Sequence, residues 1–286
     1  MLAETDVLIT GWGAPVVDLD VVRAAPRLRA VLHSAGTVKP YIGDGVLERG
    51  IKVSSAAAAN AVPVAEYTVA MIVLAGKKVL PIAARYRESR TSFAADAVFP
   101  EMGNYDVRVG IVGASKIGRL VIGMLRSYDM EVVVYDPYLS VEDAASLGVV
   151  AVELDELLAT SDVVSVHAPS LPSTLDLIDR RGIGLMRHGT TLVNTARGEI
   201  VDQVALTERV IAGEIYAILD VTVPWVLEQE HPLYSSENAL LTPHIAGSQG
   251  NELGRLADSV LRELLRLSED LPLEHGIDAA ALAITA

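Results

Sequence analysis

Short runs of β-branched and aliphatic residues alternate with stretches of helical periodicity along most of this 286-residue chain. Apolar runs linked by helices are typical of a parallel sheet that is covered on both faces. In the middle of the chain they predict strands over residues 107–112, 131–135, 149–152, 163–167, 190–194, 216–220 and 239–242. A weaker version of the same pattern predicts strands over 6–10, 29–34 and 51–55. The fold class is therefore α/β.

Helical spacing of apolar residues fills several gaps between these strands. Helices are predicted over residues 62–90, 117–128, 203–212 and 251–270. Asp202 is a plausible N-cap and Gly213 a plausible stop for the third of them. An interruption of the first is expected near Pro81, and residues 91–106 show no clear period, which indicates a linking loop or arm.

The strand and helix pattern forms two systems. One runs through the middle of the chain, and the other combines its beginning with its last helix. The sequence predicts two doubly wound parallel-sheet domains, the first from residues 1–76 and 249–286 and the second, inserted domain from 77–248. Such an arrangement places a cleft between domains, where small-molecule sites tend to form.

Composition narrows the possible partners. The net charge of −14 argues against nucleic acid or an anionic membrane, since both require a basic face. With no cysteine, disulfides and thiolate metal sites are excluded, and no metal site is expected. The N-terminus lacks the features of a signal peptide, and the longest apolar stretch, 69–76, is too short to span a bilayer. A soluble, cytoplasmic protein is expected.

The stretch "GIVGASKIGRL" follows a predicted strand and opens a helix. It aligns with the dinucleotide fingerprint G-x-G-x-x-G at Gly113, Ser115 and Gly118, so the middle glycine is missing. Any tight turn favours glycine, but Asp136 ends the next strand eighteen residues after Gly118, where a carboxylate accepts hydrogen bonds from a ribose. Asp136 is alternatively a cap for the turn before Pro137. An acid with no neighbouring arginine favours NAD over NADP.

Three polar residues end successive predicted strands: Arg197, Asp220 and His244. A lone arginine is more often a solvated charge, and a lone histidine more often a packing residue. The carboxyl ends of parallel strands lie at one edge of a sheet, which is where ligands bind in open α/β folds. A guanidinium held there can form a forked pair with a carboxylate.

At this point the sequence resembles the D-isomer-specific 2-hydroxyacid dehydrogenases. The resemblance runs through nearly the whole chain and includes "RGIKVSSAAAANAVPVAEYT", "VGIVGASKIGRLV", "VVVYDP", "SDVVSVHAPSLPSTLDLI", "TLVNTARGEIVD", "LDVTVPW" and "NALLTPHIAG". It implies a Rossmann NAD domain (77–248) inserted into a smaller flavodoxin-like substrate domain.

The resemblance also implies roles for individual residues. Arg197 orients the keto acid and His244 exchanges the proton, while NADH transfers hydride. Asp220 contacts the nicotinamide carboxamide and Asp136 the ribose. The substrate-binding residues implied are Ala35, Gly36 and Thr37 in the "SAGT" loop, through backbone N–H groups, and Trp225. The cofactor-binding residues implied are Gly113, Ser115, Lys116, Ile117, Gly118, Asp136, His167, Thr174, Thr195, Ala196, Asp220, Ala246 and Gly247.

The sequence departs from the family pattern in two places. The family glutamate that partners the histidine aligns with Trp225, and an indole cannot hold an imidazole as a carboxylate does or raise its pKa. Glu228 and Glu230 are near in sequence, and nothing shows that either reaches His244. The segment "TDVLIT" resembles the family's second strand, so the first strand-and-helix unit is missing, whether by a mis-annotated start, trimming or real loss.

These features predict an NAD-dependent oxidoreductase that interconverts a small 2-oxo acid and its D-2-hydroxy acid. The alternative is an NAD(H)-binding sensor or corepressor-like protein with little turnover. In a third interpretation, Trp225 lines a pocket for a larger or unusual acid. The family implies a homodimer, to which the 91–106 arm is a plausible contributor.

Overall fold

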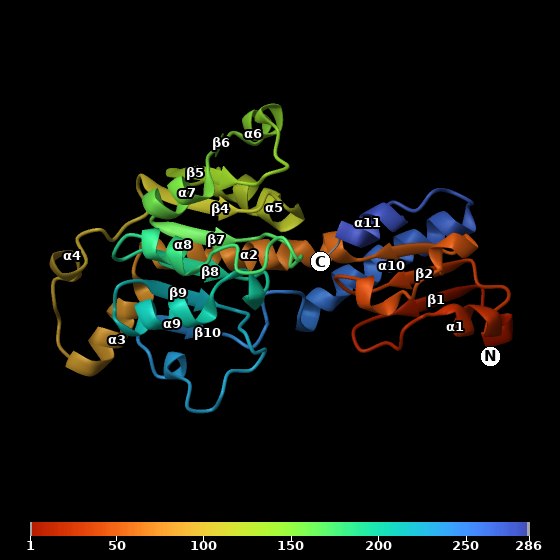
Figure 1. Cartoon of the computed structure of the whole chain (residues 1–286), viewed down its shortest axis with the longest axis horizontal. Coiled ribbons are helices and arrows are strands. Elements are labelled where there is room, and N and C mark those ends of the chain that lie inside the picture. The colour runs from red at the N-terminus through yellow and green to blue at the C-terminus, as the bar shows by residue number, and fades with distance from the viewer. Residues whose placement is uncertain (1, 285–286) are drawn as a thin grey trace. The chain divides into compact units, whose positions relative to one another are not determined.

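A seven-stranded parallel sheet forms the larger part of the computed structural model, which describes residues 2–284 (Figure 1). Its strands are β4 (Val107–Val112), β5 (Met130–Tyr135), β6 (Val150–Ala151), β7 (Val163–Val166), β8 (Thr191–Asn194), β9 (Tyr216–Leu219) and β10 (Ala239–Leu241). They lie in the order β10-β9-β8-β7-β4-β5-β6 and every pair is parallel. The strand order reverses beside β4, and ligands bind outside the carboxyl ends at such a point.

Helices cover both faces of this sheet, as the apolar runs predict. The helices are α2 (Ala57–Gly76), α3 (Val79–Ser89), α4 (Ala95–Val98), α5 (Lys116–Leu125), α6 (Val141–Leu147), α7 (Leu154–Thr160), α8 (Arg180–Leu185) and α9 (Gln203–Ile211). Val163 packs in the core shared with α2 and α5, whereas Val164 packs in the core shared with α7, α8 and α9. Adjacent strand residues point to opposite faces, which is why β7 is apolar throughout.

The predicted helix ends are partly confirmed. Asp202 caps α9 by accepting a hydrogen bond from the Ala205 N–H (2.9 Å), and Gly213 follows with a positive φ. The predicted interruption near Pro81 is observed, three residues before the proline. The helical segment breaks at Lys78, whose φ is 50°, and Pro81 lies in the first turn of α3, where a missing N–H costs nothing.

The helix α2 is long and apolar enough, by length and composition alone, to cross a membrane. Its residues Ala65, Val69 and Ile72 instead belong to the core of the seven-stranded sheet. A core helix satisfies the same length and composition criteria.

A second, smaller sheet contains β1 (Val7–Thr10), β2 (Ala30–His33), β3 (Lys52–Ser55) and β11 (Gly276–Ile277). The first three are parallel neighbours, and the two-residue β11 pairs antiparallel with β3. Leu32 packs against α10 (Leu253–Ser268) on one face, while Val31 packs with α1 (Leu19–Ala24) and its neighbours on the other. A last helix, α11, covers Ala279–Ile284. The strand β11 is too short to leave a periodic signal.

Contacts divide the chain into two units, one built from the residues up to Pro63 and from Gly247 onward, the other from Val64–Ala246. The first boundary lies thirteen residues before the expected one, because the second half of α2 packs in the core of the larger unit. The second boundary lies two residues before the expected one. Met1 and residues 285–286, at the ends of the predicted substrate domain, lie outside the described residues.

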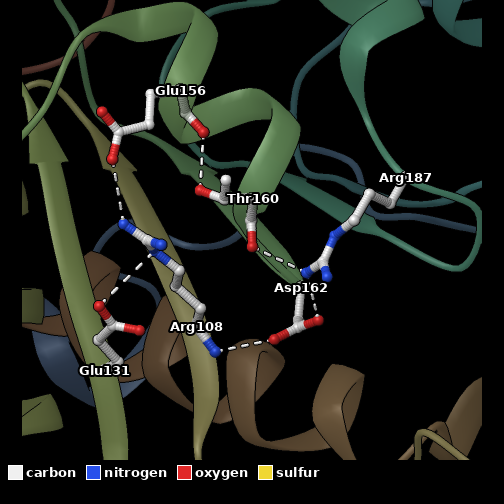
Figure 2. Close-up of polar contacts among 6 residues, drawn as sticks. All are labelled: Arg108, Glu131, Glu156, Thr160, Asp162 and Arg187. Carbon is white, nitrogen blue, oxygen red and sulfur yellow. Dashed lines mark hydrogen bonds and ion pairs between the residues drawn. The ribbon is translucent and has the colours of Figure 1, made fainter.

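Charged side chains tie together the amino ends of the seven-stranded sheet (Figure 2). Asp162, just before β7, accepts hydrogen bonds from the Arg108 backbone N–H (2.8 Å) and the Arg187 guanidinium (2.7 Å). The Arg108 guanidinium lies 3.5 Å from Glu156 and 3.8 Å from Glu131. At this edge, therefore, cations and anions are paired with each other.

Candidate active site

The loop after β8 holds Arg197 at the carboxyl edge of the larger sheet. Asn194, the last residue of β8, accepts a hydrogen bond from the Ala196 N–H (3.0 Å) and donates one to the Arg197 carbonyl (2.9 Å). The Arg197 guanidinium donates to the Ala196 carbonyl (2.7 Å). A Cβ on Gly198 would lie 2.5 Å from the Thr222 carbonyl oxygen, so only glycine allows this loop to approach the turn after β9.

Arg197 is partly buried and forms no ion pair within residues 2–284. Burial lowers the pKa of its guanidinium, and Glu199 partly opposes that shift. The group stays cationic, because an arginine is not deprotonated in proteins. It therefore has N–H donors available for an anionic ligand.

The loop after β10 carries His244 in the left-handed backbone region, with φ at 56°. Asp220, the buried residue after β9, fixes this loop. Its Oδ1 accepts from the Thr242 hydroxyl (2.6 Å) and the Ile245 N–H (2.8 Å), and its Oδ2 accepts from the Ala246 N–H (2.9 Å). The carboxylate thus stabilises a conformation that a histidine rarely adopts.

Trp225 stacks on the His244 ring, with ring centroids 4.5 Å apart and the planes at 24°. The Nδ1 atom of His244 is buried and has no hydrogen-bond partner in the described chain. Burial lowers the pKa of His244; the charge of Asp220 raises it and that of Arg197 lowers it further. Glu228 and Glu230 are exposed and are not among the charges acting on the ring. The indole covers an imidazole that has no carboxylate hydrogen-bonded to it in residues 2–284.

Two neighbouring residues of α2 contact the loops that carry Arg197 and His244, a role the sequence did not suggest. The Tyr67 hydroxyl lies 2.9 Å from the Thr242 hydroxyl in the His244 loop. The buried Thr68 hydroxyl lies 2.9 Å from the Thr195 hydroxyl in the Arg197 loop. Burial raises the pKa of Tyr67, so its phenol stays protonated. In the sequence, the only sign of this role is that two hydroxyl-bearing residues are adjacent in "AEYT". The residues that they contact cannot be read from the sequence.

The glycine-rich turn after β4 has the shape expected for a phosphate site. Gly113 has φ at 101°, and a Cβ there would lie 2.6 Å from the Ala168 nitrogen. Ser115 occupies the missing glycine position in an ordinary extended conformation and caps α5, its hydroxyl accepting from the Gly118 N–H at 3.3 Å. Lys116 and Ile117 form the first turn, which carries no acid. A helix N-terminus of this kind favours anions.

Asp136 lies directly beside this turn. Its Oδ2 accepts from the Ala114 N–H (2.7 Å) and its Oδ1 from the Tyr138 N–H (2.8 Å), so it is also the turn cap that the sequence allowed. Each oxygen retains a second acceptor position. An arginine lies nearer than the sequence suggested, because Arg119 donates to the Ala114 carbonyl (3.0 Å). Its guanidinium approaches Asp143 to 3.5 Å.

Two other predicted cofactor residues have inward-facing polar groups. His167 is buried, its Nε2 lies 2.9 Å from the Ser165 hydroxyl, and burial lowers its pKa to about 3, which keeps it neutral. Thr174 shares its hydroxyl between the Pro169 carbonyl (2.5 Å) and the Leu171 N–H (2.8 Å). Thr174 closes the loop after β7, whereas the His167 ring contacts Ser165 within β7 and its buried Nδ1 has no partner in the described chain.

The predicted substrate loop belongs to the smaller unit, directly after β2. The N–H groups of Ala35, Gly36 and Thr37 have no acceptor among the described residues. A Cβ on Gly36 would lie 3.4 Å from the Asn60 Nδ2, and the Asn60 Oδ1 accepts from the N–H of Ser248 (2.9 Å), the residue after Gly247. The larger unit therefore brings together the predicted residues from Gly113 to Ala246, while the substrate loop and Gly247 lie in the other unit.

The turn fits a dinucleotide. Its glycines form a cradle that a Cβ would fill, the helix start offers N–H donors, and Asp136 is placed for a ribose. No group of three or more His, Cys, Asp or Glu side chains in the described chain is arranged to hold a metal ion. Together the fold and the turn define a nucleotide-binding α/β protein with an arginine and a histidine at the carboxyl edge of its sheet.

Comparison with known proteins identifies the family. Residues 69–246 match the family described as "D-isomer specific 2-hydroxyacid dehydrogenase, NAD binding domain". A glyoxylate reductase of Korarchaeum cryptofilum is 31% identical over 92% of this chain and 79% of its own length. The chain belongs to the D-isomer specific 2-hydroxyacid dehydrogenases, and the inserted unit is their NAD-binding domain.

Two further relatives add to this picture. A D-3-phosphoglycerate dehydrogenase of Mycobacterium tuberculosis is 34% identical over 93% of this chain but 49% of its own length, so the chain spans about half of that relative. The crystal structure of the TT0316 protein from Thermus thermophilus superposes with a TM-score of 0.76 at 28% identity, covering 96% of this chain and 86% of the other. The resemblance stated from the motifs is confirmed.

Proposed function

We propose that the chain catalyses the NAD-dependent interconversion of a small 2-oxo acid and its D-2-hydroxy acid. The observation that carries this proposal is the Arg197 guanidinium, which forms no ion pair in residues 2–284 and lies at the same edge of the sheet as His244, whose buried Nδ1 has no partner there. A protein that only binds NAD needs neither group. The relatives are named as dehydrogenases and reductases, which favours an enzyme over a binding protein.

Arg197 and His244 divide the work on the substrate. The planar fork of Arg197 binds the carboxylate and polarises the neighbouring carbonyl. NADH, when bound, supplies a hydride to the carbonyl carbon. His244, as imidazolium, gives its proton to the carbonyl oxygen, so the 2-oxo acid gains two electrons and two hydrogens. In the oxidative direction neutral His244 takes the hydroxyl proton.

The remaining predicted residues support these two. Asp220 fixes the His244 loop, and its Oδ2 accepts one internal hydrogen bond, which leaves an acceptor for the nicotinamide carboxamide. Gly113, Ser115 and Gly118 would hold the pyrophosphate, and Asp136 the ribose. The free N–H groups of Ala35, Gly36 and Thr37 suit a substrate carboxylate. We further propose a cytoplasmic homodimer without nucleic-acid or membrane partners, in keeping with the acidic, cysteine-free composition.

Steady-state NADH oxidation tests the proposal directly. The full chain is assayed against a panel of 2-oxo acids between pH 5 and 8, and product configuration is determined by chiral chromatography. We expect at least one acid to be reduced to its D-2-hydroxy product. NADH binding without reduction of any acid in that range would replace the enzyme with an NAD-binding sensor.

A further inference from the structure

Exposed apolar side chains lie on the two loops that carry Trp225 and His244 at the carboxyl edge of the larger sheet. Trp225 is 67% exposed even though one face of its indole stacks on the imidazole. Val223 and Val226, on the same turn, and Ile245, beside the histidine, are also exposed. We call these four residues the Trp225 wall. Large apolar groups clustered at a site mark a surface that binds something apolar.

We propose that the Trp225 wall receives the side chain of the substrate, and that the substrate is a 2-oxo acid with an apolar side chain. This inference rests on the proposed function. According to this inference, Trp225, which occupies the position of the family carboxylate, selects substrates by the size and polarity of their side chains.

In the proposed function, Arg197 and His244 hold two of the three substituents on the carbonyl carbon of the substrate. The carbonyl carbon carries three substituents: the carboxylate, which Arg197 binds, the oxygen, which lies between Arg197 and His244, and the side chain. With the first two placed at those residues, the third lies near the groups that border His244. The indole, stacked on the histidine at 4.5 Å, is the largest of those groups.

Internal hydrogen bonds close the backbone turn that carries the indole, and one face of the ring stacks on His244. The Thr222 hydroxyl lies 2.8 Å from the Pro224 carbonyl and 3.3 Å from the Trp225 carbonyl, closing the turn that carries the ring. The approach of Gly198 to Thr222 fixes the same turn against the Arg197 loop. A preorganised apolar surface loses little conformational entropy on binding.

The charge around the wall argues against phosphorylated or dicarboxylic acids. The segment from Asp220 to Ala246 contains no lysine or arginine and carries four carboxylates, Asp220, Glu228, Glu230 and Glu237. Arg197 and Asp220 are the charges that act on His244. A second anionic group on the substrate requires a second cation, and none lies on this segment.

A graded series of acids tests the inference. The kcat/KM of the full chain is measured with pyruvate, 2-oxobutanoate, 4-methyl-2-oxopentanoate and phenylpyruvate, and with 3-phosphohydroxypyruvate as the charged comparison. Three extra buried carbons are expected to raise kcat/KM from pyruvate to 4-methyl-2-oxopentanoate by roughly 30-fold. A flat series, or a best substrate that is phosphorylated, overturns the inference while leaving the proposed function intact.

Variants identify the wall as the source of the preference. Trp225→Ala should reduce the ratio between the large and small acid to about threefold or less, and Trp225→Phe should keep most of it. Tyr105→Ala is the matched control, since Tyr105 is a 79% exposed aromatic just before the amino end of β4. An unchanged ratio in Trp225→Ala assigns the preference elsewhere and refutes the inference.

A binding measurement covers the case in which no acid is reduced. The protein saturated with NADH is mixed with D-lactate or D-2-hydroxy-4-methylpentanoate, and affinity is measured by saturation-transfer NMR. Tighter binding of the larger acid by roughly tenfold, lost in Trp225→Ala, supports the wall even without turnover. Equal affinities contradict it. If no acid is reduced but the larger acid still binds more tightly, the proposed chemistry has failed while the inference about the Trp225 wall holds.

Discussion

The two edges of the seven-stranded sheet use charge in opposite ways. At the amino edge, Asp162 and Arg108 are each paired with groups of opposite charge (Figure 2). At the carboxyl edge, the Arg197 guanidinium donates to the carbonyl of the preceding residue, Ala196, and the His244 Nδ1 has no partner in residues 2–284. The charged side chains at the amino edge are therefore ion-paired, although the Arg108 Nε has no hydrogen-bond partner, whereas Arg197 at the carboxyl edge forms no ion pair in residues 2–284.

This difference predicts that the two edges contribute differently to the free energy of unfolding and to catalysis. A polar group without a partner costs free energy when it is buried, so such groups persist where a ligand or substrate completes them. Substitutions at the amino edge should therefore change the free energy of unfolding and leave catalysis alone. Substitutions at the carboxyl edge should do the reverse.

The largest effect is expected at Arg197. Arg197→Lys keeps the charge but removes the planar fork and the paired hydrogen bonds, so kcat/KM for a 2-oxo acid should fall by about a thousandfold. The Kd for NADH, measured by fluorescence titration, should change less than about threefold, since the cofactor turn is untouched. Arg187→Lys, at the amino edge, is the matched control and should retain activity. Equal losses of NADH binding and turnover in Arg197→Lys would contradict the assignment.

The amino edge should show the opposite behaviour. Asp162→Ala leaves the Arg108 N–H without an acceptor and Arg187 without its ion pair, so the free energy of unfolding should drop by about 1–2 kcal/mol. The pair with Arg187 is half exposed and contributes little of this. Urea denaturation measures the loss, and kcat/KM should stay within about twofold. Asp162→Asn, which keeps an acceptor, should recover part of the stability; a catalytic defect without a stability loss would break the comparison.

The sequence predicted the fold well because buried parallel strands are nearly continuous apolar runs. The strand 107–112 is observed over the predicted residues, and the others differ by a residue or two at their ends. The predicted interruption near Pro81 occurs three residues before the proline, because proline is tolerated in the first turn of a helix and the sequence does not show where that turn begins. The break depends on Lys78, whose side chain is buried and donates to the distant Gly189 carbonyl (2.6 Å).

The candidate site was predictable where it depends on strand ends and not where it depends on tertiary contact. Arg197, Asp220 and His244 follow strands whose carboxyl ends share an edge, so their proximity follows from the pattern. The links of Tyr67 and Thr68 join residues more than one hundred positions apart. No local pattern contains that information. The sequence likewise does not show that Trp225 stacks on His244 or that the His244 Nδ1 lacks a hydrogen-bond partner in the described chain.

Asp136 extends the comparison to cofactor choice. Its carboxylate would accept ribose hydroxyls and repel a 2′-phosphate, so NADH should bind more tightly than NADPH despite Ser115 and despite the nearby Arg119. Asp136→Ala should weaken that preference by about tenfold or more, the scale of one charged hydrogen bond. Because Asp136 also caps the turn, Asp136→Asn keeps a cap and separates the charge effect from a folding effect. Equal binding of both cofactors to the unaltered protein would exclude the role.

The smallest expected effect concerns the proton that His244 transfers. Burial and Arg197 lower its pKa, and Trp225 supplies no charge to restore it. Reduction requires imidazolium, so its rate should fall as pH rises through the pKa of His244, with a midpoint at or below roughly 6.5. Oxidation requires the neutral ring and should show the opposite dependence, rising through the same pH range.

Trp225→Glu restores a carboxylate beside the ring. An adjacent negative charge favours imidazolium, so the midpoint for reduction should move upward and turnover near neutral pH should increase by about three- to tenfold. The gain should appear in kcat with the smallest acids, since the same change removes the apolar wall and penalises large ones. Trp225→Gln, uncharged and of similar size to glutamate, is the control and should leave the midpoint unmoved.

A profile that is unchanged in Trp225→Glu but lost on substituting Glu228 or Glu230 would show that one of those carboxylates already supports the histidine. If His244→Ala retains the rate, the imidazole is a packing residue and the proton comes from elsewhere.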